Sequence, residues 1–450
     1  MSDTGKERAT ERESETPAVS GPFRQFFSFR RDVLVLSVAM FAFSLGFQMT
    51  TRYVPKYMEV LGASALAIGL FGTVQNVIGA VYPYPGGVVS DRLGSRLSLT
   101  LFGLLSSLGF LVWLLAPALG AVSGVEPWLW LFVGVLFAQA WKSLGLGATF
   151  AIVRQSVQPS RLARGFASTE VFRRTAFLFG PLVAAGVLFV AAEFAVGFRA
   201  ILAVALLFGL AATAVQHRSY RAEDTSIGDS FEGLETVLAD LRGLPPELRP
   251  LLFADTLVRF ANGMVYVFFV IVVTDFLAVG LDLGVVVLEP TVFFGFLLAV
   301  EMVVALVSMP VAARLAESVG LKPVVALGFS VYAVFPALLV FSPANPAVLI
   351  ALFALSGLRF AGLPAHKALI VGPAERDSGG RVAGSYYLVR NTVVIPSAAL
   401  GGALYGGFTV PGTGLSVSGS PELAFSLATA IGLLGTALFV GYGREFGPYE

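Results

Sequence analysis

The eleven residues "GGVVSDRLGSR", Gly86–Arg96, lie between two long apolar stretches of the chain. They contain three glycines, one acid and two arginines, although only 13% of the 450 residues are charged. A chain this apolar needs a physical reason to place so much charge in one short turn. The composition of the whole chain is the first part of that reason.

The composition is that of an integral membrane protein. Hydrophobic residues make up 56% of the chain, and the mean hydropathy is +0.81. A soluble protein of this size carries charge on roughly a quarter of its residues. We therefore expect most of the outer surface to face lipid, in a multi-pass protein of the cell membrane. The chain has no cysteine, which excludes disulfides and cysteine-ligated metals.

Apolar stretches long enough to cross a bilayer recur along the chain. A helix needs about 20 apolar residues to span the hydrocarbon core. This criterion predicts an all-α membrane protein with twelve transmembrane helices in two pseudo-symmetric six-helix bundles. The expected spans lie near residues 33–55, 63–89, 97–117, 127–153, 164–190, 196–216, 250–276, 285–312, 322–342, 346–369, 381–406 and 423–442.

One long polar stretch divides the spans six and six. The expected domains are a disordered cytoplasmic tail over 1–31, an N-terminal bundle over 32–216, a cytoplasmic linker over 217–248, a C-terminal bundle over 249–443 and a cytoplasmic tail over 444–450. Lys and Arg are concentrated in loops on the cytoplasmic side of membrane proteins. With both termini placed in the cytoplasm, the outer loops hold Lys56, with Arg52 and Arg199 as further candidates. The distribution therefore predicts that both termini are cytoplasmic.

An internal repeat relates the two halves. Aligning Gly145 with Gly362 gives a shift of 362 − 145 = 217, and the same shift pairs Lys142 with Arg359. It also pairs Arg173 with Arg390, Thr175 with Thr392, and Gly46 with Gly263. Since each half contains an even number of spans, we expect parallel repeats about an axis along the membrane normal.

The turn between spans two and three resembles the signature loop of the major facilitator superfamily, roughly G-x-x-x-D-R-x-G-x-R/K. The matching residues are Gly87, Asp91, Arg92, Gly94 and Arg96. A degenerate copy, "ARLAESVGLK", lies between spans eight and nine and carries Glu317, Gly320 and Lys322 at equivalent places. The resemblance implies twelve helices, transport, and a conformational latch formed by these residues. The alternative is a loop in which Arg92 and Arg96 only fix the orientation of the chain in the membrane.

Span five carries "FLFGPLVAAG", which is similar to a Gly-Pro motif of antiporters in this superfamily, with Ala185 in place of a second glycine. Gly180 and Pro181 thin the helix and free a backbone carbonyl. They form either a packing kink or a bend that sets how the halves close.

Several charged residues lie deep in the predicted spans. Lys142, Arg359, Arg173 and Arg390 approach the midplane, where ionisable groups face a cavity or a partner. The acids at similar depth are Glu301 and, nearer the cytoplasm, Glu170, while Asp255 and Arg259 lie one helical turn apart and can neutralise each other. The excess of cations predicts an anionic or polar substrate.

Two interpretations of these residues remain open. Lys142 and Arg359 are candidates for substrate contact, with hydrogen bonds from Gln48, Gln139 and Asn262. Arg359 can instead be locked onto Glu301. Glu170, Arg173, Glu301 and Arg390 are candidates for proton coupling or for structural ion pairs.

The sequence predicts a secondary transporter that works by alternating access, as an exporter or antiporter of an anionic or polar organic solute. No motif of a metalloprotease, a nucleophile elbow or a phosphate-binding loop favours an enzyme. The alternative is a transporter-like membrane protein that binds a ligand or partner without moving it. We expect no cofactor, no metal and no nucleic acid, and the expected partners are a small solute, lipid and a coupling proton or ion, in a monomer.

Overall fold

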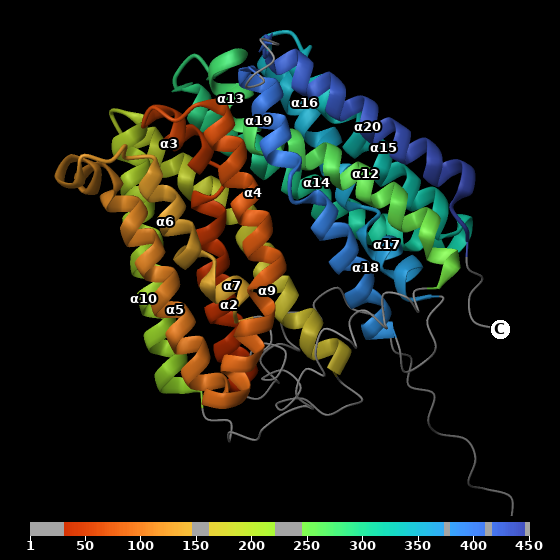
Figure 1. Cartoon of the computed structure of the whole chain (residues 1–450), viewed down its shortest axis with the longest axis horizontal. Coiled ribbons are helices and arrows are strands. Elements are labelled where there is room, and N and C mark those ends of the chain that lie inside the picture. Colours follow the sequence, from red (N-terminus) through yellow and green to blue (C-terminus); the bar gives the residue numbers. More distant parts are fainter. Residues whose placement is uncertain (1–30, 146–161, 221–244, 373–378, 410–415, 446–450) are drawn as a thin grey trace, which may run out of the picture.

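Two helical bundles make up the molecule, and they meet at one end and diverge toward the other (Figure 1). The computed structural model describes residues 31–145, 162–220, 245–372, 379–409 and 416–445. Within these ranges the helices run roughly side by side along the long direction of each bundle. The end at which the bundles meet is called the closed end below.

Each bundle is built from consecutive helices. The first consists of α2 (Arg31–Thr50), α3 (Val54–Val60), α4 (Ala65–Val81), α5 (Pro83–Ser123), α6 (Leu129–Ala138), α7 (Ala140–Ser143), α9 (Leu162–Val190) and α10 (Phe194–Ser219). The second consists of η2 (Pro246–Leu248), α12 (Arg249–Val265), η3 (Tyr266–Phe268), α13 (Phe269–Ile271), η4 (Val272–Phe276), α14 (Pro290–Val319), α15 (Leu321–Val340), α16 (Pro346–Gly357), η5 (Leu358–Phe360), α17 (Leu363–Val371), α18 (Gly379–Val394), α19 (Ser397–Gly406) and α20 (Pro421–Tyr442).

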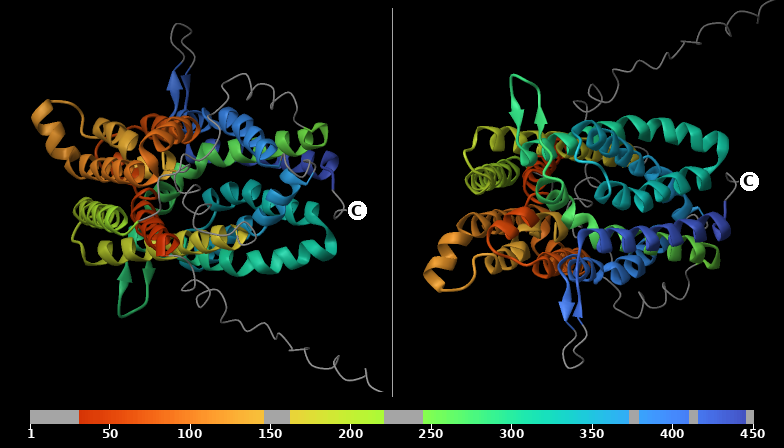
Figure 2. Two further views of the ribbon diagram at one scale, coloured as in Figure 1. Left: turned by 90° about the horizontal axis from the view of Figure 1, so that it is seen from below. Right: turned by 90° about the horizontal axis from the view of Figure 1, so that it is seen from above.

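Two short antiparallel hairpins complete the described fold. One pairs β1 (Leu281–Asp282) with β2 (Val287–Leu288), and the other pairs β3 (Phe408–Thr409) with β4 (Ser416–Val417). They project from opposite sides of the molecule (Figure 2).

The helices bear out the predicted fold class, an all-α membrane protein with two bundles. Seven helices of the described part of the chain are long and apolar enough to cross a membrane. Four shorter apolar helices, over Val35–Thr50, Ala65–Val81, Leu129–Ser143 and Thr175–Val190, overlap further predicted spans. The predicted span 381–406 coincides with α18 and α19.

The backbone repeats its irregularities in the two bundles. Span four breaks at Gln139, between α6 and α7, and span ten breaks after Gly357, where η5 begins. Adding the shift, 139 + 217 = 356, places the two breaks within one residue of each other. The turns before α15 and inside α5 also match, because Gly94 (φ 77°, ψ 156°) and Gly320 (φ 92°, ψ 166°) share a backbone conformation that essentially only glycine adopts.

The prediction of a turn extending over Gly86–Arg96 is wrong in its extent. The chain resumes helix at Pro83 and stays helical up to Gly94, where it turns. Proline is favoured in the first turn of a helix, and Pro83 and Pro85 both lie there. Gly86 serves a different purpose, since a Cβ at this position would lie 2.0 Å from the carbonyl oxygen of Leu144. Gly94 thus forms the turn, whereas Gly86 allows the close approach to span four.

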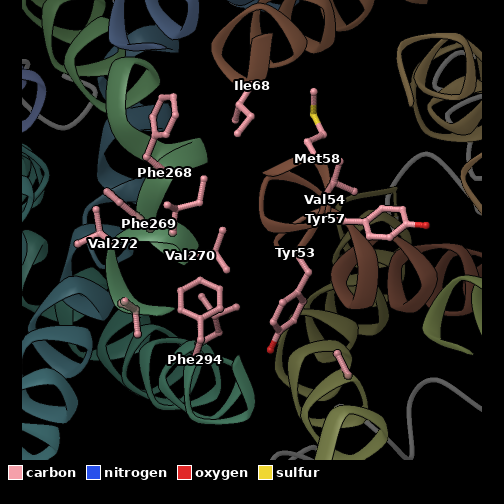
Figure 3. Packing of buried hydrophobic residues seen from close by; sticks show 14 of the residues in the cluster. Tyr53, Val54, Tyr57, Met58, Ile68, Phe268, Phe269, Val270, Val272 and Phe294 are labelled. Carbon is pink, nitrogen blue, oxygen red and sulfur yellow. The ribbon is translucent and has the colours of Figure 1, made fainter. Parts of the chain in front are cut away.

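Apolar side chains from both bundles pack together at the closed end (Figure 3). Tyr53 and Phe294 face each other across the boundary, with ring centroids 5.7 Å apart in an edge-to-face arrangement. Ile68 of the first bundle and Phe268 of the second belong to the same buried cluster. The two bundles therefore share one buried apolar cluster at the closed end.

Candidate functional site

Small residues bring α4 and α19 together across the boundary between the bundles. A Cβ on Gly69 would lie 2.4 Å from the carbonyl oxygen of Ala398, and a Cβ on Gly402 would lie 3.0 Å from the Cα of Gly69. The amide of Ala399 donates a hydrogen bond to Thr73 Oγ1 at 3.0 Å. The two helices therefore touch through their backbones, which no larger residue would allow.

The Gly180-Pro181 pair lies at a second contact, between α9 and α14. A Cβ on Gly180 would lie 2.5 Å from the Cβ of Gln48 in α2. On the other side, a Cβ on Gly295 would lie 2.8 Å from the carbonyl oxygen of Pro181 and 2.5 Å from the hydroxyl of Tyr53. The predicted kink is therefore a contact point between the bundles.

An ion pair also links the bundles at the closed end. Lys56 of α3 contacts the carboxylate of Asp275 in η4 and lies 3.0 Å from Glu59. Burial disfavours the charged ammonium, but the hydrogen bonds to Asp275 and Glu59 outweigh this effect and raise the pKa of Lys56. The lysine therefore stays charged while it bridges the two bundles.

The central cluster is built on Glu301, whose side chain is 2% exposed. Its Oε1 accepts hydrogen bonds from Arg359 Nη2 at 2.5 Å and from Ser356 Oγ at 2.6 Å. Its Oε2 lies 3.7 Å from Nη2 of Arg52, which belongs to the first bundle and stacks 4.1 Å from the ring centre of Tyr266. One buried carboxylate thus meets an arginine from each bundle.

A second cluster, the Asp255 cluster, lies within the second bundle. Asp255 in α12 is fully buried, and its Oδ1 accepts a hydrogen bond from Arg259 Nε at 3.2 Å. Its Oδ2 lies 3.1 Å from Arg390 Nη1, 3.1 Å from the hydroxyl of Tyr386 and 3.3 Å from Nε2 of His366. Four side chains from three helices therefore converge on this carboxylate.

Tyr332 connects the two clusters. Its hydroxyl accepts a hydrogen bond from Arg259 Nη1 at 2.9 Å. The guanidinium carbons of Arg259 and Arg359 lie 4.6 Å and 5.2 Å from its ring centre. The connected set holds four arginines and two carboxylates, a formal charge of 4 − 2 = +2 without counting His366. An excess of cations is what the sequence predicts at this depth.

The other predicted substrate contacts are dispersed. Lys142 is exposed at the end of α7, and Gln139 is buried at the break before it. Asn262 is half-buried in α12, and Gln48 packs against Gly180. Arg359 points away from solvent toward Glu301, which corresponds to the second of its two interpretations.

The predicted latch is described only in part. The side chains of Asp91, Glu170 and Arg173 lie outside the described part of the structure, as does most of the linker 217–248. Arg92 is exposed, and Arg96 donates a hydrogen bond from Nε to the carbonyl of His217 at the end of α10, at 2.8 Å.

The second copy of the loop uses a different contact. Glu317 is exposed, and the amides of Leu321 and Lys322 donate to the carboxylate of Glu445 at 2.6 Å and 2.7 Å. In the first copy, a Cβ on Gly87 would meet no atom within 4 Å, so packing against the described residues does not require glycine there.

The structure adds detail to two expectations. Arg390 forms an ion pair, and its carboxylate partner is Asp255, because α18 packs against α12. Arg52, a further candidate for the outer loops, lies in the turn between α2 and α3 with its side chain 12% exposed. The contact between Asp255 and Arg259 is confirmed, although Asp255 is shared among further partners. Sequence reasoning missed His366, Tyr386 and Tyr332, whose polar groups lie on otherwise apolar helices.

The chain was compared with known families and relatives. A model of the Major Facilitator Superfamily matches residues 4–125 and 36–293. An uncharacterized MFS-type transporter of Mycobacterium tuberculosis (strain CDC 1551 / Oshkosh) is 31% identical over 209 residues, which are 45% of this chain and 46% of the relative. The same values hold for the protein of a second strain of that species. The chain thus matches about half the length of these curated relatives.

Solved structures share the fold at low sequence identity. A variant of the nucleoside transporter NupG has a TM-score of 0.72 at 12% identity, over 92% of this chain and 100% of that one. A peptide transporter POT variant in complex with sulfate has a TM-score of 0.66 at 15% identity, over 92% and 96%. A bacterial homologue of the iron transporter ferroportin in an inward-facing state has a TM-score of 0.63 at 13% identity, over 92% and 99%. These similarities concern the fold alone.

Proposed function

The chain belongs to the Major Facilitator Superfamily, and we propose that it is a secondary transporter that moves a small anionic or polar organic solute by alternating access. The observation that carries this proposal is the central cluster, where Glu301 meets Arg359 of its own bundle and Arg52 of the other. A site that touches both bundles is where a bound solute can influence how they move relative to each other.

The charge of the connected clusters supports an anionic group on the substrate. Four arginines face two carboxylates, so an incoming carboxylate, sulfonate or phosphate adds a counter-charge that these clusters lack among the described residues. Arginine holds such groups through two parallel hydrogen bonds. We infer that the anionic group competes with Glu301 for Arg52 and Arg359, and that Lys142, exposed on α7, is a further cation on the route of the solute.

The contacts at the closed end support a rocking motion. Opening that end requires separation of α4 from α19 and rupture of the pair between Lys56 and Asp275. At the opposite end the bundles diverge (Figure 1), and we propose that the loop around Asp91, Arg92 and Arg96 engages there when the arrangement reverses. Gly180 and Pro181 lie at the α9–α14 contact. Their resemblance to the Gly-Pro motif of antiporters in this superfamily is the reason we propose an exporter or antiporter.

Flux through sealed vesicles tests the proposal. Protein in liposomes is assayed for uptake and efflux of radiolabelled organic anions, neutral sugars and cationic drugs, with protein-free vesicles as blanks. We expect flux of at least one anion. Arg359→Gln is expected to weaken its half-saturation by tens- to thousands-fold, from about 2–5 kcal/mol of lost contact. Arg314→Gln, at an exposed arginine on α14, is the matched control.

The double variant Glu301→Gln with Arg359→Gln separates substrate contact from structure. If it restores both yield and anion affinity that the single changes lose, Arg359 has a structural role and the anion binds elsewhere. Saturable binding of an anion without flux in either direction would instead favour the alternative of a transporter-like binding protein.

A further inference from the structure

A β-hairpin with an apolar tip lies beside the closed end. Residues 277–289 connect two helices that are long and apolar enough to cross a membrane, Pro246–Phe276 and Pro290–Val319. This connection contains β1 and β2, and seen along the helices it projects sideways beyond both bundles (Figure 2). A segment that extends sideways from the ends of two spans lies over the lipid around the protein.

The backbone fixes the direction and the shape of this hairpin. Ala278, where the chain leaves η4, has a φ of 52°, which residues with a side chain rarely adopt. Leu281 and Leu288, paired across the two strands, pack against the buried cluster of the closed end. At the tip, the amide of Gly284 donates a hydrogen bond to Asp282 Oδ1 at 2.7 Å. The hairpin is therefore held at its base and closed by its own turn.

The side chains that point away from the bundle at the tip are aliphatic. Leu283 is 61% exposed, Val285 95% and Val287 59%. Single exposed apolar residues are common on protein surfaces, but three on one turn form a patch of the kind that marks contact with a protein or a membrane. Because the backbone of the hairpin is fixed, this patch stays directed outward.

The charge of the hairpin and the helices on either side of it favour lipid as the partner. The connection contains no Lys or Arg, and its two acids are Asp282 and Glu289. Attraction to anionic headgroups depends on basic residues, so the contact must be apolar. Phe276, before the hairpin, is 41% exposed, and α14, after it, carries exposed Val303 and Val307 one helical turn apart. The apolar tip is therefore continuous along the chain with helices that present apolar surface to lipid.

We propose that Leu283, Val285 and Val287 insert into the lipid leaflet at the closed end, so that the β1–β2 hairpin anchors the second bundle at the membrane interface. The outer edges of the two strands carry unpaired amides and carbonyls, which hydrocarbon cannot satisfy. The backbone therefore stays among the hydrated headgroups while the aliphatic side chains reach the acyl chains. The anchor is independent of the proposed transport function, since it requires only that the chain spans a membrane.

Spin-label accessibility in liposomes tests the anchor in the full chain. The chain has no cysteine, so Val285→Cys carries a single nitroxide. Molecular oxygen concentrates among acyl chains, whereas a polar nickel complex, present on both sides of the membrane, stays in water. Because transfer of a polar complex into an apolar environment is costly, we expect the ratio of oxygen to nickel accessibility at Val285→Cys to be at least ~3-fold higher than at Ala344→Cys.

Two matched positions calibrate this ratio. Ala344, exposed in the turn between α15 and α16 at the same end of the second bundle, reports on water. Leu207, which is 65% exposed in α10, reports on lipid after Leu207→Cys. When Leu283→Ser and Val287→Ser are added to Val285→Cys, the ratio should fall close to the Ala344→Cys value, because polar side chains remove the reason for insertion.

A ratio at Val285→Cys equal to that at Ala344→Cys places the tip in water and overturns the proposal. Low accessibility to both reagents also overturns it, since a second copy of the chain or another protein would then cover the tip. A lipid-like ratio that survives both serine substitutions would show that the nitroxide itself enters lipid, and the anchor would again be rejected. A lipid-like ratio at Val285→Cys together with absent solute flux would retain the anchor and reject the transport function.

Discussion

The two bundles share their backbone irregularities and differ in their buried charge. Asp255 and Arg259 of α12 have Val38 and Ala42 as counterparts in α2, since 255 − 217 = 38 and 259 − 217 = 42. The counterpart of Arg390 is Arg173, whose side chain lies outside the described residues. In the first helix of each half, therefore, the backbone shape is repeated, whereas the charged side chains at these positions are not. The difference shows that these two helices share a backbone design, whereas the buried charge at these positions belongs to the second bundle alone.

The two copies of the signature loop differ in a similar way. Each glycine turn is tied to the end of the last helix of its bundle. In the first, the Arg96 guanidinium binds a carbonyl of the last turn of α10. In the second, the Glu445 carboxylate, which follows α20, binds the first amides of α15. Arg96 places a positive charge at the C-terminal end of α10, and Glu445 places a negative charge at the N-terminal end of α15. Each charge has the sign that the helix dipole favours at that end. The same turn is thus stabilised by two chemically different caps.

The largest effect is expected when buried charged residues of the second bundle are replaced by the residues at the equivalent positions of the first bundle. Asp255→Val leaves Arg259 and Arg390 without their carboxylate and should cost about 3–5 kcal/mol. Thermal unfolding in detergent, followed by intrinsic fluorescence, measures the loss. Asp255→Val with Arg259→Ala, which copies Val38 and Ala42, should be less destabilised than Asp255→Val alone. A double variant that is worse than the single change would mean that Arg259 stabilises the bundle independently of Asp255.

The next effect concerns the contact through which the bundles meet. Gly69→Ala places a Cβ against the carbonyl of Ala398, and we expect overpacking of about 1–3 kcal/mol that favours separation of the closed end. Gly79→Ala in the same helix is the matched control, because a Cβ there meets no atom within 4 Å. A cysteine at Ile68, which is 2% exposed in the closed-end cluster, reports opening through its rate of alkylation. Equal rates in the two variants would show that this contact does not hold the end closed.

A smaller effect tests whether the two glycine turns are equivalent. Gly94→Ala and Gly320→Ala each force a side chain into a backbone region that essentially only glycine adopts, at a cost of about 1–3 kcal/mol. Since the dihedral angles are alike, the two losses in thermal stability should agree within error. A much larger loss at one site would mean that its cap, Arg96 or Glu445, depends on the turn more strongly than the other.

Orientation is tested by labelling that should leave stability unchanged. The chain has no cysteine, so single cysteines at exposed Ser123 and Ser318 report without background. A membrane-impermeant maleimide should label Ser123→Cys in intact cells, and Ser318→Cys only after permeabilisation. Labelling of Ser318→Cys from outside would reverse the assignment of the two ends of both bundles.

Much of the fold could be predicted from the sequence because apolar length and repeated glycines are local signals. Gly94 and Gly320 mark equivalent turns, and Lys142 and Arg359 mark equivalent helix breaks. The partners of Asp255 other than Arg259 could not be predicted, since Arg390 lies 135 residues away and counting residues gives depth in a helix without its neighbours. Arg52 was ambiguous because it lies in the break between α2 and α3, where neither helical spacing nor loop composition applies.

The apolar seal at the closed end has a thermodynamic consequence. Tyr53, Phe294, Ile68 and Phe268 are buried in one cluster that spans the bundles, so separation of this end transfers their surface into water. Hydration of apolar surface increases the heat capacity, and near room temperature its penalty is almost entirely entropic. The ratio of closed to open molecules should therefore follow a curved van't Hoff plot. Cooling weakens such seals, so a larger share of molecules should have the closed end open near ~5 °C than at about 30 °C.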